Sequence, residues 1–376
     1  MRELLRLLGR DARFELALVL TGSHLSAELG STWREVQADG IEIRSKVDML
    51  LSSDNPVAIA KSLGLGVIGF AHAFETIAPD MVVLPCDRFE ILAAAQAALI
   101  ARLPIAHLYG GEVTEGAFDD AFRHAITKMA QLHFVAAEPY RQRVIQLGEQ
   151  PETVFNVGAP GLDGLDKVNW PPREDLVKEY DLSPGAQVFL VTYHPSTLGD
   201  VTPEVALAEL LTALDRFPEA NVVFTAPNAD PSGRSILNRI AAYARGREPR
   251  VKLHLSLGRT KYLSLMRISD IVIGNSSSGI TEAPALRRAS VNVGQRQTGR
   301  LKAKSVIDCR ESADEIELAI RHALSPGFRE ALPRTASHYG QGGASALIVD
   351  ILARWLPVAS KGKHFYDLVP IGPEPL

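Results

Sequence analysis

The sequence predicts an α/β protein made of two Rossmann-like, doubly wound domains that face each other across a cleft. Short apolar runs typical of buried parallel strands recur with helical stretches between them, which is the alternation of such a fold. The chain has 376 residues, enough for two domains because a single core rarely exceeds about 250–300 residues. A polar, proline-bearing segment at residues 168–175 is the best candidate linker.

The first half is expected to begin on a helix at residues 3–8 and to continue with five strands. The apolar run after this helix is interrupted by Asp11 and Glu15 and ends without a cleavage site, so we interpret it as a strand and not as a secretory signal. The expected strands cover residues 14–21, 81–85, 105–109, 132–136 and 154–157.

One element of the usual pattern is missing from the start of this sequence. A doubly wound domain ordinarily begins with its central strand, whereas no apolar run precedes the helix at residues 3–8. Without that strand we expect a gap in the middle of the first sheet, with unpaired backbone groups on either side.

The second half is expected to hold another parallel sheet, with strands at residues 188–192, 222–225, 252–255, 271–273 and 290–293. We therefore divide the chain into an N-terminal domain at residues 1–167, a C-terminal domain at residues 168–350, and a helix and tail at residues 351–376 that pack back on the N-terminal domain. Ligand sites of α/β proteins usually form at the carboxyl ends of the strands, so the cleft between the two sheets is where a site is expected.

The composition excludes several classes of protein. A 46% hydrophobic content with 22% charged residues is typical of an ordinary globular chain. The net charge of -4 gives no reason to expect nucleic acid as a partner. Cys86 and Cys309 are the only cysteines and form no metal-binding spacing. We therefore expect a reducing cytosol, no metal and no membrane partner.

The most informative motif is the serine-rich turn at residues 273–284, which follows an apolar strand and opens a helix. The first N–H groups of a helix have no partner within it, and the helix dipole favours negative charge there, so the turn predicts a phosphate site. Without a lysine after the glycines it is not a P-loop, and a capped helix after a buried strand is an equally good interpretation of the turn alone. The candidate ligand residues are Ser277, Ser278, Gly279 and Glu282.

Carboxylates follow several predicted strands of the first half. Asp87 is next to Arg88 after one strand, and Glu112 follows two glycines after the next, while Asp119 and Arg123 open a helix. Arg88 and Arg123 are candidate substrate contacts. Each has a structural interpretation as a solvated pair or a helix cap. Together, carboxylates converging in a partly desolvated cleft raise one another's pKa and supply both an acid and a base.

The second half places polar residues after its own strands. His194 is fixed by a following proline and is a candidate to protonate or bind a phosphate leaving group. Asn228 lies in a similar turn, which is also common in ordinary loops. Arg296 and Arg300 carry guanidinium groups suited to diphosphate oxygens.

Several segments together resemble one known family. They are residues 21–25 (TGSHL), 86–89 (CDRF), 110–116 (GGEVTEG), 119–128 (DDAFRHAITK) and 274–284 (GNSSSGITEAP). From about residue 14 to residue 368, the chain resembles the hydrolysing UDP-N-acetylglucosamine 2-epimerases, on the branch that serves sialic and legionaminic acid synthesis. Several motifs in one order are far more specific than any one of them.

The resemblance implies a fold of the glycosyltransferase-B type, with the nucleotide held mainly by the second domain. It also implies elimination followed by hydration. A base removes the C2 proton while UDP leaves C1, and water adds to the resulting 2-acetamidoglucal to release UDP and a free manno sugar. Such a site needs carboxylates near the sugar and cations near the phosphates, and no cofactor.

Carried over residue by residue, the resemblance assigns a role to each candidate. The proton-transferring carboxylates are Asp87, Glu112 and Asp119, and the sequence does not say which is the base and which the acid. The groups near the nucleotide are His194 for departure of the diphosphate, Ser277 and Ser278 for its cradle, Glu282 for the ribose, and Asn228 and Arg296 for further contacts.

The start of the sequence departs from this family. Relatives begin with a strand and a Gly-x-Arg-Ala-like turn whose arginine contacts the diphosphate, and that element is missing here. Either translation starts upstream or the chain has lost activity. We favour an upstream start, because every downstream catalytic position holds a residue that fits the family's pattern.

The sequence leaves further alternatives open. A glycosyltransferase of the same architecture and a non-catalytic UDP-sugar binder remain as other functions. The substrate is UDP-GlcNAc, a UDP-2,4-diacetamido-2,4,6-trideoxy sugar or a GDP counterpart, and no residue decides between them. A dimer or tetramer is expected from the family.

Overall fold

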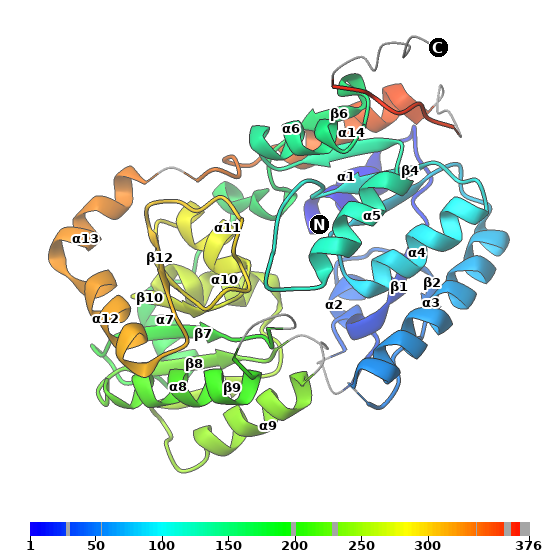
Figure 1. Cartoon of the computed structure of the whole chain (residues 1–376). Coiled ribbons are helices and arrows are strands. Elements are labelled where there is room, and N and C mark those ends of the chain that lie inside the picture. The colour runs from blue at the N-terminus through cyan, green and yellow to red at the C-terminus, as the bar shows by residue number, and fades with distance from the viewer. Residues whose placement is uncertain are drawn as a thin grey trace, which may run out of the picture.

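The computed structural model describes residues 1–27, 31–53, 55–196, 201–227, 232–335, 337–356 and 362–368. It has two Rossmann-like halves, each built on parallel strands, which lie side by side (Figure 1). The fold class predicted from the sequence is confirmed.

The strands of the N-terminal half form two separate parallel sheets. One is a four-stranded sheet in the order β3 (Val82–Pro85), β4 (Ile105–Leu108), β5 (Leu132–Val135) and β6 (Val154–Asn156). The other pairs β1 (Leu18–Thr21) with β2 (Ile43–Val47).

The two sheets of this half share one hydrophobic cluster. Val47 of β2 packs there with Val82 and Leu84 of β3. Nevertheless, no described residue pairs β1 with β3. The described strands of this half therefore form two sheets and not one continuous sheet.

Helices cover both faces of the N-terminal sheet. The side chains of β3 alternate, so that Val82 and Leu84 meet the cluster under α3 (Pro56–Ile77) and α4 (Phe89–Ile100). Val83 points to the other face, where α1 (Arg2–Arg10) packs against α14 (Ala344–Trp355). The remaining helices of this half are α2 (Trp33–Ala38), α5 (Asp119–Met129) and α6 (Glu138–Gln146).

The C-terminal half holds one six-stranded parallel sheet in the order β12-β11-β10-β7-β8-β9. Every residue of β7, β8, β10 and β11 is buried, which explains their continuous apolar runs. The strands are β7 (Val188–Thr192), β8 (Asn221–Thr225), β9 (Val251–His254), β10 (Ile271–Gly274), β11 (Ala289–Val293) and β12 (Val306–Cys309).

Seven helices accompany this sheet in the part of the chain that is described. They are α7 (Arg173–Glu179), α8 (Pro203–Asp215), α9 (Gly233–Ala244), α10 (Gly258–Ile268), α11 (Ser278–Ala285), α12 (Ala313–Leu324) and α13 (Pro326–Ala331). After α13 the chain returns to the N-terminal half, where α14 packs on α1 and Lys363 forms an ion pair with Glu149 at 2.6 Å.

All ten predicted strands form, but the predicted set was incomplete. β1 begins at Leu18 and not at residue 14, because Phe14 and Leu16 pack against α1 instead of pairing. β2 and β12 were not predicted. Both lie at the edge of a sheet and are only partly buried, so they lack the apolar run that marks the central strands.

Candidate active site

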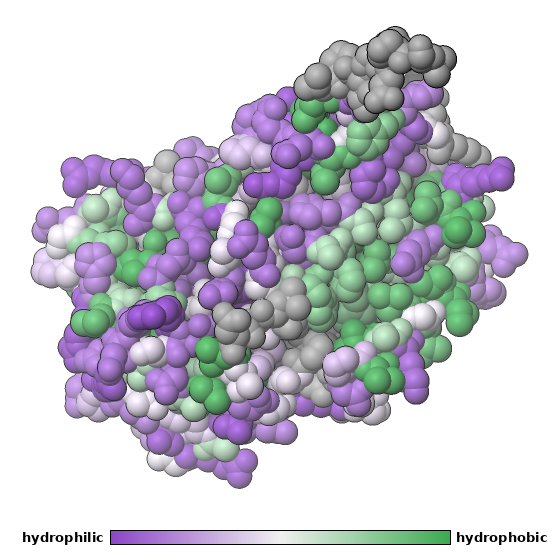
Figure 2. All heavy atoms as spheres, viewed as in Figure 1, coloured by the Kyte–Doolittle hydropathy of each residue, from purple (hydrophilic) through white to green (hydrophobic). Residues whose placement is uncertain are grey.

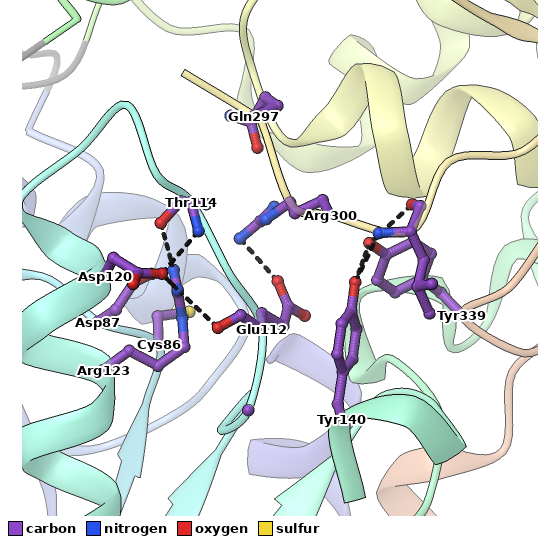
Figure 3. Close-up of polar contacts among 12 residues, drawn as sticks. Cys86, Asp87, Glu112, Thr114, Asp120, Arg123, Tyr140, Gln297, Arg300 and Tyr339 are labelled. Atoms are coloured by element: carbon purple, nitrogen blue, oxygen red, sulfur yellow. Dashed lines mark hydrogen bonds and ion pairs between the residues drawn. The ribbon is translucent and has the colours of Figure 1, made fainter. Parts of the chain in front are cut away.

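The candidate site lies where the carboxyl ends of strands from both halves meet. Figure 3 shows Asp87, Glu112 and Arg123 of the N-terminal half facing Arg300 of the C-terminal half. The chain brings these groups together because parallel strands end at the same edge of their sheets.

Two strand ends of the N-terminal half are conformationally strained. Cys86 after β3 has φ 66° and Tyr109 after β4 has φ 67°, a left-handed region that residues other than glycine rarely adopt. Such strain persists where surrounding contacts enforce it and is common at functional sites.

A buried histidine fixes the turn after β3. His107 donates from Nε2 to the Cys86 carbonyl at 2.9 Å and accepts at Nδ1 from Thr127 Oγ1 at 3.1 Å. Burial lowers the pKa of His107 to about 3, so the ring is neutral and acts as a positioning group for the residue that follows, Asp87.

Arg123 organises the carboxylates. Its side chain is 1% exposed and forms an ion pair with Asp87, while Nη1 lies 2.9 Å from Asp120 Oδ1. The same guanidinium donates to the Glu112 carbonyl and to Thr114 Oγ1, each at 3.0 Å. Arg123 was predicted as a substrate contact, and in the structure its donors are directed at protein groups (Figure 3).

Glu112 joins the two halves of the molecule. Its Oε2 lies 2.7 Å from Arg300 Nη2, and the Glu112 side chain is 3% exposed while that of Arg300 is 12% exposed. Burial raises the pKa of the Glu112 carboxyl, and Arg300 opposes part of that shift. Arg300 was predicted to bind diphosphate oxygens, and in the structure its guanidinium pairs with Glu112.

Asp119 and Asp120 are neighbours with different surroundings. Asp120 accepts from the Thr114 N–H at 2.6 Å and pairs with Arg123. Asp119, which is 4% exposed, lies 3.9 Å from Arg88 Nη1. The sequence singled out Asp119, and only the structure shows that the neighbouring Asp120 anchors the loop.

In the C-terminal half, His194 follows β7 and is buried. The Asn275 side chain accepts from the His194 N–H at 2.7 Å and donates to its carbonyl at 2.8 Å. Two residues further on, Ser196 Oγ donates to the Gly116 carbonyl of the other half at 3.1 Å. His194 is therefore held beside the loop that carries Glu112.

The serine-rich turn opens α11 as the sequence predicted. Ser278 Oγ lies 2.6 Å from the Tyr262 hydroxyl and donates to Ser276 Oγ at 3.0 Å. A Cβ at Gly279 would lie 2.6 Å from Ser290 Oγ, so this glycine serves close packing of α11 on β11. Gly279 remains a predicted ligand residue only through its backbone.

Glu282 lies one turn into α11. Burial raises the pKa of its carboxyl to about 7. A Cβ at Gly161 would meet Glu282 Oε1 at 3.3 Å and the Tyr109 hydroxyl at 3.5 Å. The Met1 amino group is close enough to stabilise the Glu282 charge, and Figure 1 places the N-terminus between the two halves.

The remaining predicted nucleotide contacts lie near the same turn or outside the described residues. Arg296 Nη1 donates to the Asn275 carbonyl at 3.4 Å, and Gln297 Nε2 donates to the same oxygen at 2.7 Å. Asn228 lies outside the described residues.

A tyrosine pair that no sequence signal identified lies beside Arg300. The Tyr140 and Tyr339 hydroxyls are 2.9 Å apart. Tyr140 accepts from the Leu301 N–H at 2.9 Å, and Tyr339 donates to the Leu301 carbonyl at 3.1 Å. These bonds hold the segment that presents Arg300 to Glu112 (Figure 3).

Among the described residues no cluster of three or more His, Cys, Asp or Glu side chains could hold a metal ion.

A family model described as UDP-N-acetylglucosamine 2-epimerase matches residues 6–353. The chain belongs to this family. It is 38% identical to the GDP/UDP-N,N'-diacetylbacillosamine 2-epimerase (hydrolyzing) of Campylobacter jejuni, over 88% of this chain and 85% of that protein. It is 34% identical to the UDP-N,N'-diacetylbacillosamine 2-epimerase (hydrolyzing) of Legionella pneumophila, over 96% of this chain and 93% of that protein.

Solved structures of the family share the fold. The UDP-GlcNAc 2-epimerase of Neisseria meningitidis, solved with UDP-GlcNAc, superposes with a TM-score of 0.79 at 17% identity, over 94% of this chain and 96% of that one. Membership of the family and the named relatives make the chain a hydrolysing nucleotide-sugar 2-epimerase. The glycosyltransferase and the non-catalytic binder are not favoured.

Proposed function

We propose that the substrate is a UDP-linked 2,4-diacetamido-2,4,6-trideoxy sugar, with UDP-GlcNAc as the weaker substrate. Two relatives that match most of the chain are named for N,N'-diacetylbacillosamine. The observation that carries the chemistry is the meeting of three N-terminal carboxylates with the serine-rich turn and His194 of the C-terminal half.

The proposed reaction is elimination followed by hydration. A carboxylate removes the C2 proton, the C1–oxygen bond breaks, and its electron pair leaves with UDP, so that a C1–C2 double bond forms. Water then adds its hydroxyl to C1 while a proton returns to C2 from the opposite face. The products are UDP and a free sugar with inverted C2.

The carboxylates divide this work according to their surroundings. Asp87 forms an ion pair with Arg123, and in this proposal it is the carboxylate that acts as the base. Burial raises the pKa of the Glu112 carboxyl, which favours Glu112 in this proposal as the group that transfers a proton to the substrate. Asp119, near Arg88, is the third member and is placed beside the sugar in this proposal.

The nucleotide is proposed to lie on the C-terminal half. The first N–H groups of α11 and its dipole favour the diphosphate, and Arg296 next to the turn adds positive charge. His194 donates a hydrogen bond as the leaving oxygen gains charge. Glu282 accepts hydrogen bonds from the ribose hydroxyls.

The substrate is tested by comparing kcat/KM for the UDP-linked diacetamido sugar, its GDP form and UDP-GlcNAc. We expect the UDP-linked diacetamido sugar to be preferred by at least about tenfold, since a substrate that leaves one buried polar group of the site without its partner loses about 1–3 kcal/mol. Preference for UDP-GlcNAc would contradict the proposed substrate but not the proposed reaction.

The free cysteines Cys86 and Cys309 are consistent with a proposed place in the cytoplasm.

A further inference from the structure

The tail segment, residues 362–368, carries one lysine toward the N-terminal half. It lies on the surface (red in Figure 1), in a region where Figure 2 shows hydrophilic and hydrophobic residues side by side. Phe365 is 63% exposed and Leu368 is 59% exposed, so burial of apolar side chains is not what holds the segment. The Lys363 side chain, by contrast, is only 23% exposed. The contacts of Lys363 are therefore the ones that fix the segment.

Lys363 closes the C-terminal end of α5. Its Nζ donates to the Ala130 carbonyl at 2.7 Å and to the Thr127 carbonyl at 3.4 Å. The last carbonyls of a helix lack regular helical partners, and the helix dipole places partial negative charge at this end. The ammonium group supplies both a donor and a positive charge there, so it ties the end of α5 to the tail segment.

A buried carboxylate holds the same ammonium group. Glu149 is 1% exposed, and its Oε2 lies 2.6 Å from Lys363 Nζ. Lys128 Nζ lies 2.7 Å from Oε1, and His133 Nε2 lies 3.0 Å from Oε2. Burial alone would raise the pKa of the Glu149 carboxyl, and the hydrogen bonds from His133, Lys128 and Lys363 together lower it to about 2. A buried charge is unfavourable unless it is paired, so Glu149 favours a cation at this position.

The rest of the tail segment fits the surface beneath it. Gly148 has a φ of 87°, and a Cβ built there would collide with the Phe365 ring. The Tyr366 N–H donates to the Gly148 carbonyl at 2.9 Å. These contacts fix the register of the segment, so that Lys363 lies at the end of α5.

The same helix positions groups of the candidate site. Asp119 opens α5, and Arg123 one turn later forms an ion pair with Asp87. In the last turn Thr127 Oγ1 donates to His107, which fixes the turn that precedes Asp87. A displacement of α5 would therefore move Asp119 directly and Asp87 through two contacts. A misplacement of about 1 Å can lower a reaction rate by about 10²-fold.

We propose that Lys363 is a positioning residue for the reaction, because it holds the C-terminal end of α5 against Glu149 and thereby sets the positions of Asp87 and Asp119. Lys363 acts through the helix and is not itself catalytic. Its role rests on the proposed roles of the two carboxylates.

A purely structural role is the competing explanation, in which Lys363 only neutralises the buried charge of Glu149. Both roles predict a lower stability without Lys363. Only the positioning role predicts slower turnover by protein that is still folded.

Lys363→Met tests the role, because it removes the charge and keeps most of the side-chain length. At a temperature where circular dichroism shows the variant to be folded, we expect kcat to fall by about tenfold or more, with KM and the Kd for UDP nearly unchanged. Lys363→Arg keeps the charge and the N–H donors and should restore most of kcat. Lys252→Met is the matched control, since the Lys252 side chain is 19% exposed and pairs with Asp181 at 2.8 Å in the C-terminal half. An unchanged kcat in folded Lys363→Met, or no recovery in Lys363→Arg, would overturn the proposal.

Phe365→Ala is the second variant, for use if Lys363→Met does not fold. It loosens the tail segment and leaves the Lys363 charge in place, and the exposed ring makes it the milder change. We expect a smaller loss of kcat in the same direction, and wild-type kcat would contradict the proposal.

Amide hydrogen exchange without substrate gives a measurement that does not depend on the proposed function. We expect residues 119–129 to exchange faster in Lys363→Met than in wild type, and Lys363→Arg to restore their protection. Unchanged exchange would show that Lys363 does not hold α5. Faster exchange with wild-type kcat would show that the position of α5 does not govern the reaction, and would equally overturn the role of Lys363.

Discussion

Each carboxylate of the site lies beside a different arginine: Arg123 for Asp87, Arg300 for Glu112, and Arg88 for Asp119. An arginine stabilises the charged form of a carboxyl group, and burial destabilises that form. At Glu112 burial prevails over Arg300 and raises the pKa of the carboxyl. This shift is the reason that the proposed mechanism gives Glu112 a role of its own in proton transfer.

Replacing Glu112 by Gln should lower kcat by about 10²–10⁴-fold, because an amide does not transfer the proton. The binding of UDP, measured by calorimetry, should be nearly unchanged, since the nucleotide is proposed to lie on the other half. Glu115→Gln is the control in the same loop, because Glu115 is exposed. Equal activity of the two variants would remove Glu112 from the mechanism.

The pKa of about 7 at Glu282 predicts pH-dependent nucleotide binding. In the proposed complex ionised Glu282 accepts hydrogen bonds from the ribose. Protonation removes this acceptor, so affinity for UDP should rise with pH through about 7. Only about a tenth of the groups are ionised one pH unit below the pKa. The phosphate also titrates here, so the comparison is with Glu282→Gln. Identical pH profiles for the two proteins would exclude the role of Glu282.

The sequence predicts most of these candidates because they follow strands whose carboxyl ends must meet. It does not predict that Arg300 binds Glu112, since nothing local links residues from two different halves. The same limit applies to Tyr140 and Tyr339, which are ordinary aromatic residues until the fold brings their hydroxyls together.

At the scale of elements, α11 must lie close to β11 for its first N–H groups to reach the cleft. Gly279→Ala should destabilise the protein by about 1–3 kcal/mol, because the new Cβ would lie 2.6 Å from Ser290 Oγ. In Ser290→Ala, which removes that oxygen, the same substitution should be neutral or stabilising, since alanine favours a helix by about 1 kcal/mol over glycine. Urea unfolding of the four proteins measures this coupling, and additive effects would refute the contact.

The strands that escaped prediction have one physical property in common. β2 and β12 lie at the edges of their sheets and expose part of their side chains. A strand of this kind carries polar residues, such as Arg44 and Asp308, that resemble a loop. Central strands such as β7 and β8 are buried along their whole length, so their sequence alone reveals them.

At the scale of the whole molecule, the two halves are joined through the site itself. The Glu112–Arg300 ion pair, the Ser196–Gly116 hydrogen bond and the bond from the Glu115 N–H to the Thr298 carbonyl at 3.2 Å all cross between them. Movement of one half against the other therefore changes the surroundings of Glu112.

Tyr140→Phe tests this coupling. The substitution leaves the Leu301 N–H without its acceptor, at a cost of about 1–3 kcal/mol, and loosens the segment that presents Arg300. We expect lower stability together with a severalfold loss of kcat. Tyr180→Phe is the control, because the buried Tyr180 hydroxyl has no hydrogen-bond partner among the described residues. Unchanged kcat in Tyr140→Phe would show that the tyrosine pair is structural only.

The central claim is elimination and hydration at C2 of a nucleotide sugar. The most direct measurement follows the protein with the UDP-linked diacetamido sugar, and separately with UDP-GlcNAc, by NMR in D₂O. The account predicts equal amounts of UDP and of a free sugar with inverted C2 and one deuterium at that carbon. A free sugar with retained C2 and no deuterium would show simple hydrolysis and would contradict the account.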